Sequence, residues 1–99
     1  MTEDVNINLP ELIVSKIKAE LKTLHLWLED KSHMHSSHNK ASAHGNTHFF
    51  LKVVSDEFTN LDMLQRHKRV NAILRKEYRL FHSLRILALT GEEHKNAAR

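Results

Sequence analysis

The sequence predicts an α+β domain whose elements follow the order helix, strand, strand, helix, strand. Two observations favour this fold. Apolar residues recur at helical spacing in two segments, 8–23 and 60–78. Three shorter segments, 24–30, 48–55 and 83–89, have the alternation or the β-branched content that is typical of strands. With 99 residues and 40% hydrophobic residues, the chain is long enough for one domain with its own core.

The first helix, at 8–23, is predicted from apolar side chains repeated every four residues. The repeat consists of Leu9, Ile13, Ile17 and Leu21. Asn8 can cap this helix, and Pro10 in its first turn costs no backbone hydrogen bond. The next segment, LHLWLED, places Leu24, Leu26 and Leu28 on one side of a strand. We therefore expect these leucines to face the core.

The other three elements come after residue 47, and the first of them begins within the histidine-rich segment 32–50. HFFLKVVS at 48–55 combines aromatic and β-branched residues, which indicates a more buried, central strand. Helical spacing returns from Asn60 to Tyr78, with Asn60 as the predicted cap and the helix either continuous or broken near Arg66. SLRILAL at 83–89 alternates again and predicts a third strand before a polar tail.

Connection rules predict how the three strands are arranged. The first two strands are joined by a loop and should pair antiparallel, whereas the helix between the second and third should make a right-handed crossover between parallel strands. The second strand begins where the histidine-rich segment ends, and a parallel third strand begins at the same end of the sheet. We therefore expect His82, just before the third strand, to lie near that segment.

The histidine-rich segment is the most unusual feature of the composition. It contains five of the nine histidines, and the chain has no cysteine, so disulfides and thiolate ligands are excluded. Metal chemistry would fall to histidine and carboxylates. One alternative is opportunistic binding of zinc, nickel or copper by His33, His35 and His38. The sequence has no nucleophile elbow, no glycine-rich phosphate loop and no paired-carboxylate motif, so we expect no enzyme.

A second candidate site is basic. Net charge is +3, with a pI near 9.4, and cationic residues are expected along one face of the second helix. They are Lys68, Arg69, Arg75, Lys76 and Arg79, and Arg66 is a further candidate for binding a partner or nucleic acid. This face is either simply solvated or contacts phosphates or a partner. RNA binding by a Gly-x-x-Gly loop is disfavoured because the only glycines are Gly45 and Gly91.

Four separated motifs, in the right order, resemble the BolA family from about residue 10 to residue 93. They are DKSHMHSSH, THFFLKVVSDEFTNL, RHKRVNAIL and FHSLRILALTGEE. The chain departs from the family pattern at Ser83, where alanine is usual, at Gly91, where proline is usual, and at His94, where tryptophan is common. The resemblance implies a fold similar to type II KH domains, with a three-stranded mixed sheet and helices packed on one side.

The resemblance also implies a function. Family members pair with monothiol glutaredoxins and share a [2Fe-2S] cluster with them and with glutathione, in iron–sulfur trafficking or iron and redox regulation. His82 matches the family's cluster histidine. Counting forward from Asp30 selects His35 as the second ligand, whereas counting back from Thr47 favours His38. The alternative is a stress-response transcription regulator that binds DNA through the basic helix at 66–79, as some bacterial members are regarded.

The expected organisation is a flexible N-terminus at 1–8, one BolA-like domain at 9–93 and a flexible tail at 94–99. We expect a monomer when the protein is alone, with no membrane segment and no signal peptide. The expected location is the cytoplasm, or the mitochondrion if the protein is eukaryotic and processed.

Overall fold

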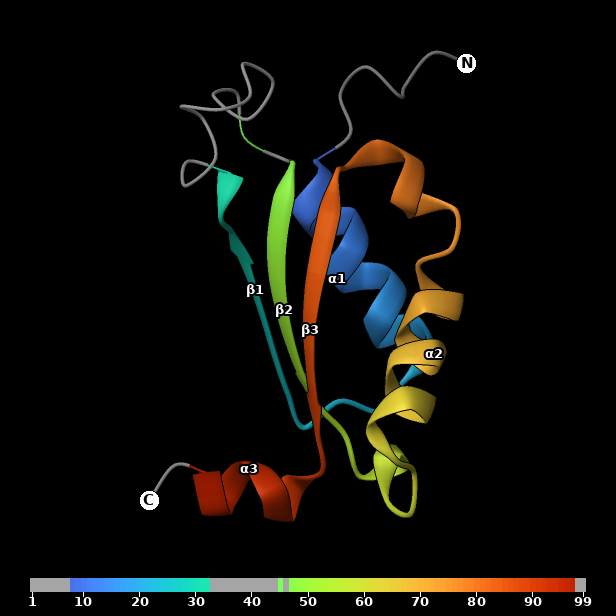
Figure 1. Cartoon of the computed structure of the whole chain (residues 1–99), viewed down its shortest axis with the longest axis vertical. Coiled ribbons are helices and arrows are strands. Elements are labelled where there is room, and N and C mark those ends of the chain that lie inside the picture. Colours follow the sequence, from blue (N-terminus) through green and yellow to red (C-terminus); the bar gives the residue numbers. More distant parts are fainter. Residues whose placement is uncertain (1–7, 33–44, 46, 98–99) are drawn as a thin grey trace.

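A computed structural model describes residues 8–32, 45 and 47–97 (Figure 1). Its elements follow the predicted order, with short 3₁₀ helices on either side of the second long helix and one additional helix at the end. In chain order they are α1 (Leu9–Glu20), β1 (His25–Asp30), β2 (His48–Val54), η4 (Asp56–Phe58), α2 (Met63–Ile73), η5 (Glu77–Leu80), β3 (Ser83–Leu89) and α3 (Gly91–Ala97).

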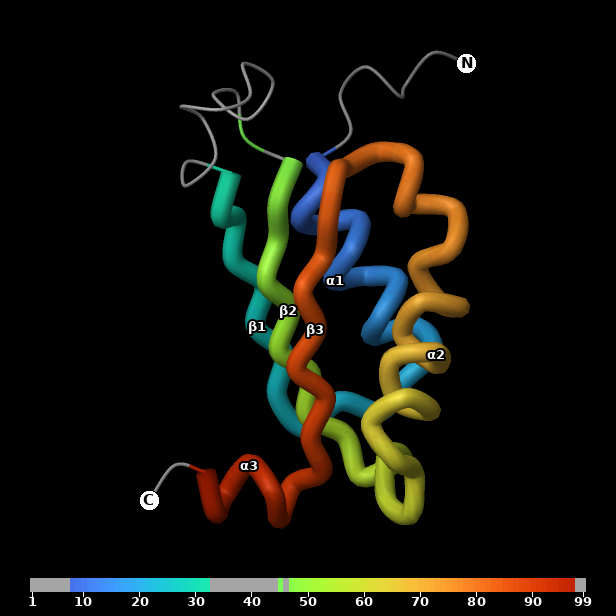
Figure 2. Tube along the Cα trace, viewed as in Figure 1, coloured from blue at the N-terminus to red at the C-terminus, as the bar shows by residue number. Residues whose placement is uncertain are grey.

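The sheet has the predicted topology. Its strand order is β1-β2-β3, with β1 and β2 antiparallel and β2 and β3 parallel. The Cα trace in Figure 2 shows β2 between the other two strands, and β2 and β3 beginning at the same end of the sheet. The prediction that the second strand is central is confirmed, because Leu51 and Val53 of β2 are completely buried.

The core lies between the sheet and one layer formed by α1 and α2. Ile13 and Ile17 of α1 are fully buried in the same hydrophobic cluster as Val70 of α2 and Leu51 of β2. The predicted α1 stripe is thus confirmed. Leu24 differs from the prediction: it precedes β1 at the edge of the sheet and is 62% exposed.

The second long helix is shorter than predicted. Asp62 caps it in a reciprocal capping box with Gln65. Asn60, the predicted cap, has a positive φ of 69° and lies outside the helix. The helix is continuous through Arg66, and it ends at Ile73 instead of extending to Tyr78, which lies in η5.

The sequence predicts only a polar tail after β3, but the helix α3 occupies Gly91–Ala97. A capping box again explains where the helix begins. The Glu93 backbone N–H donates to Thr90 Oγ1, and the Thr90 N–H donates to a Glu93 carboxylate oxygen. The Thr-x-x-Glu pattern at 90–93 is therefore the sequence signal that indicates this helix. Among the described residues, no helix is long and apolar enough to cross a membrane.

Candidate functional site

His82 lies at the sheet end where β2 and β3 begin. Its backbone N–H donates to the Thr47 carbonyl at 2.8 Å, and the Ser83 N–H donates to the same oxygen at 3.0 Å. The imidazole rings of His82 and His48 are 4.9 Å apart between centroids. The predicted proximity of His82 to the end of the histidine-rich segment is confirmed, because the parallel crossover returns the chain to the start of β2.

Ser32 holds the two ends of the histidine-rich segment together. Its hydroxyl oxygen is buried and accepts the backbone N–H groups of Thr47 at 2.8 Å and His48 at 3.1 Å. The Ser32 N–H donates to the Asp30 carboxylate at 2.8 Å. Residues 32 and 47 are therefore fixed beside His82. The two candidate loop ligands, His35 and His38, lie outside the described residues.

The exposed His82 side chain is suited to act as a metal ligand. Its ring contacts His48 but makes no hydrogen bond within the described part of the chain. His48 differs, because its Nδ1 lies 2.9 Å from the Thr47 hydroxyl, which restricts the ring. No group of three histidine, aspartate or glutamate residues among those described could hold a metal ion. A metal ion at His82 would therefore need ligands from outside the described residues.

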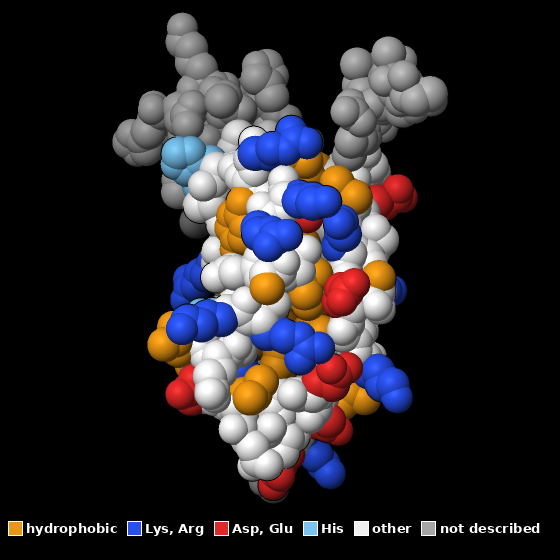
Figure 3. Space-filling view, turned by 90° about the vertical axis from the view of Figure 1, so that its right-hand side faces the viewer, with side chains coloured by type: hydrophobic (Ala, Val, Ile, Leu, Met, Phe, Trp, Pro, Cys, Tyr) orange, Lys and Arg blue, Asp and Glu red, His pale blue; other side chains and the backbone are white. Residues whose placement is uncertain are grey.

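The basic residues do not form the single helical stripe that the sequence analysis predicted. Because α2 ends at Ile73, Arg75 and Lys76 lie in the following turn and Arg79 lies in η5. Figure 3 shows the side of the molecule that is on the right in Figure 1, where α2 lies. Lys and Arg side chains gather toward the upper end of this side, and acidic side chains are interspersed among them lower down. The exposed members of the predicted set are Lys68, Arg75, Lys76 and Arg79.

The other two predicted basic residues are engaged within the fold. Arg66, a candidate binding residue, is only 6% exposed. Arg69 is half-buried: its guanidinium donates to the Glu57 carboxylate at 2.9 Å and to the Glu20 carbonyl at 3.4 Å. The Lys22 backbone N–H, followed by Arg69, holds the pKa of Glu57 below its ordinary value.

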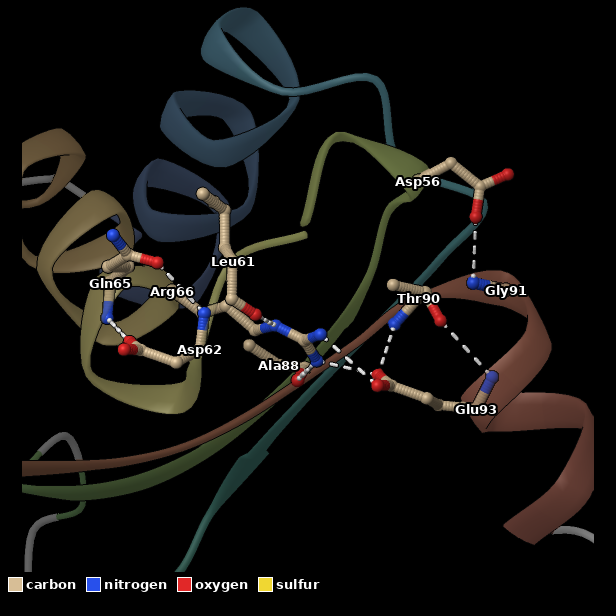
Figure 4. Close-up of polar contacts among 9 residues, drawn as sticks. All are labelled: Asp56, Leu61, Asp62, Gln65, Arg66, Ala88, Thr90, Gly91 and Glu93. Carbon is tan, nitrogen blue, oxygen red and sulfur yellow. Dashed lines mark hydrogen bonds and ion pairs between the residues drawn. The ribbon is translucent and has the colours of Figure 1, made fainter. Parts of the chain in front are cut away.

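Arg66 joins α2 to the last strand and to α3 (Figure 4). Its Nε donates to the Leu61 carbonyl at 2.9 Å, and Nη1 donates to the Ala88 carbonyl at 3.0 Å. Nη1 and Nη2 also donate to the two Glu93 carboxylate oxygens, at 2.6 and 3.1 Å. This bidentate contact, followed by the Thr90 N–H, lowers the pKa of Glu93 to about 2. Helical spacing to the buried Val70 was the sequence signal for an inward-facing Arg66.

His94, the departure from the family's tryptophan, lies against the opposite end of the sheet from His82. Its ring stacks on that of His25, with centroids 5.1 Å apart and an interplanar angle of 19°. Partial burial, followed by electrostatic interactions with Lys52 and His25, lowers the pKa of His94. This pair is therefore a separate contact and does not contribute to the His82 end of the sheet.

A family model described as "BolA-like protein" matches residues 17–93. The chain is 37% identical over 92 residues to a protein of Haemophilus influenzae named "DNA-binding transcriptional regulator BolA", covering 90% of this chain and 84% of that protein. The structure resembles BolA1 of Arabidopsis thaliana, with a TM-score of 0.75 and 31% identity over 88% of this chain and 96% of that one.

A second similar structure is the BolA domain of SufE1 from Arabidopsis thaliana. The TM-score is 0.73 and the identity 34%, covering 84% of this chain and 92% of that domain. The SufE-like protein 1 sequence is much longer, and the chain spans 23% of its length. The similarity therefore covers one domain of that protein.

Proposed function

Because the chain belongs to the BolA-like family, we propose that it is an adaptor that pairs with a monothiol glutaredoxin and shares a [2Fe-2S] cluster with it. His82 and one loop histidine, His35 or His38, would hold the cluster from this side. The partner and its glutathione would supply the remaining ligands. Imidazole ligands in place of thiolates raise the reduction potential of such a cluster.

The observation that carries this proposal is the exposed imidazole of His82 beside the two fixed ends of the histidine-rich segment. Ser32, the first residue of that segment, accepts the Thr47 N–H, and the Thr47 carbonyl accepts the His82 N–H. The loop that carries His35 and His38 therefore starts and ends close to His82, which would allow one of these histidines to bind the same metal as His82. The chain has no cysteine, so histidine is its best ligand for iron.

The test reconstitutes the heterodimer with a monothiol glutaredoxin and replaces His82, His35 and His38 with alanine one at a time. We expect His82→Ala to abolish the visible circular dichroism spectrum of the heterodimeric cluster. One of the two loop substitutions should weaken the spectrum, and the other should leave it unchanged. His25→Ala is the matched control, since His25 is exposed and pairs with the far end of β2. An unchanged spectrum for His82→Ala would rule the proposal out.

A DNA-binding regulator is the second candidate function, favoured by the name of the Haemophilus relative and by the exposed cations of α2 and the following turn. Contacts to phosphates make DNA affinity fall as salt is added. The logarithm of the binding constant decreases linearly with the logarithm of the salt concentration, with a slope of about 0.9 for each phosphate contact on duplex DNA. Replacing both Arg75 and Lys76 with glutamine should therefore reduce the slope by about 2. Lys18→Gln, on exposed α1 surface, is the control. Binding that survives the combined loss of Lys68, Arg75, Lys76 and Arg79 would exclude this function.

A further inference from the structure

The face of the sheet opposite α1 and α2 carries aromatic and cationic side chains. Side chains alternate along a strand, so the burial of Phe49, Leu51 and Val53 in the helix-covered core directs Phe50 and Lys52 to the other face. In Figure 1, α1 lies behind the strands, and no described helix crosses in front of their upper part. On this face Trp27 and Arg85 are exposed, and Phe50 and Lys52 are partly exposed.

Strand register places the open-face residues in adjacent rows. Lys52 is opposite Trp27 of β1, and Phe50 is opposite Arg85 of β3. Trp27 and Phe50 are therefore diagonal neighbours, a relation that separates residues by about 7–8 Å. Each aromatic ring has a cationic residue directly across from it. Trp27 is 53% exposed, although a large aromatic side chain normally gains by burial.

The open face is positively charged. Its acidic residue, Glu29, is paired with Lys31 at 3.4 Å. Lys52 and Arg85 form no salt bridge with any residue that the structure describes. Two unneutralised cations thus lie beside two aromatic rings. Their charge is complementary to that of a phosphate backbone.

A hollow of about 480 Å³ opens on this face beside Phe50. Its lining is mixed: Arg85 and Lys31 are cationic, Glu29 is acidic and paired with Lys31, and the remaining residues are His48, Phe49, Phe50 and Ser83. Sites for small ligands have volumes of about 300–1,000 Å³, with apolar walls and a few polar groups. A nucleobase against the aromatic ring, with its phosphate near Arg85, matches this lining.

We propose that the open sheet face binds single-stranded nucleic acid, with bases stacked on Trp27 and Phe50 and phosphates near Lys52 and Arg85. Exposed sheet aromatics flanked by cations bind unpaired bases in this way, because every base has a π-face. A duplex keeps its base faces stacked internally, so it could use the cations but not the rings. An acidic peptide would likewise leave both rings unused. This activity goes beyond the adaptor function and uses a different surface from Arg75 and Lys76.

Trp27 is the only tryptophan in the chain, so its fluorescence reports directly on this face. We expect a short oligothymidine to quench Trp27 fluorescence, whereas a duplex of the same length and concentration should not. Phe50→Leu, which keeps an apolar side chain, should weaken binding about tenfold or more. The double substitution Lys52→Gln and Arg85→Gln should reduce the salt slope by about 1.4 for single strands. Circular dichroism checks that each variant is folded.

Two controls separate this proposal from the functions above. The Arg75→Gln, Lys76→Gln variant and the His82→Ala variant should bind oligothymidine as tightly as the wild type. Trp27→Leu is tested by the fluorescence anisotropy of a labelled oligothymidine and should also bind about tenfold or more weakly. Equal quenching by polyglutamate, equal quenching by duplex DNA, or unchanged affinity in both aromatic variants would each overturn the proposal.

Discussion

Replacing Arg66 with methionine should destabilise the fold by at least about 3 kcal/mol. Methionine keeps much of the apolar stem but removes the guanidinium that donates to the Leu61 and Ala88 carbonyls. Each charged hydrogen bond contributes about 1.5 kcal/mol or more to stability. The side chain of Glu93 is 45% exposed, so solvent screens its ion pair with Arg66, and that pair adds less.

Urea unfolding followed by far-ultraviolet circular dichroism measures this loss as a lower midpoint. The matched control is Arg69→Met, three residues further along α2, where the guanidinium contacts an exposed carboxylate. The control should change the midpoint much less, because the Arg69 side chain is 39% exposed and that of Arg66 only 7%. Equal midpoints for the two variants would refute the argument that burial makes the Arg66 contacts strong.

Two further predictions concern the ends of β3 and β2. Nuclear magnetic resonance should show the Glu93 carboxyl titrating with a pKa of about 2. Because this pKa lies below the ordinary value of 4.5, the ionised Glu93 stabilises the fold above about pH 4.5, and this contribution is lost as the pH falls toward 2. In the Arg66→Met variant the pKa of Glu93 should return toward 4.5. An unchanged pKa would contradict the assignment of the shift to Arg66. Ser32→Ala should destabilise the fold by about 2 kcal/mol, because two backbone donors lose their acceptor. Amide hydrogen exchange should then accelerate at Thr47 and His48, and unchanged exchange at both would contradict the role given to Ser32.

Sequence periodicity was sufficient for the order of the elements and for the main core, since both depend on residues close together in the chain. The repeat from Leu9 to Ile17 identified the buried stripe of α1, which the structure confirms. The parallel pairing of β2 and β3 then placed His82 beside Thr47, although 35 positions separate them, because parallel strands begin at the same end of the sheet. Local patterns and a general topological rule together predicted the candidate site.

The sequence by itself thus determined the strands, their pairing and the His82 end of the sheet, because these follow from short-range periodicity and chain connectivity. The environment of each charged side chain was decided by tertiary structure. Arg66 looks like its basic neighbours in the sequence, but its partners are the Ala88 carbonyl, 22 residues away, and Glu93, 27 residues away. Likewise, α2 ends at Ile73, so Arg75 lies outside the helix that the periodicity of the sequence predicts as far as Tyr78. Periodicity indicates which face a residue occupies, whereas only the packed chain brings together the distant acceptors that allow a cation to be buried.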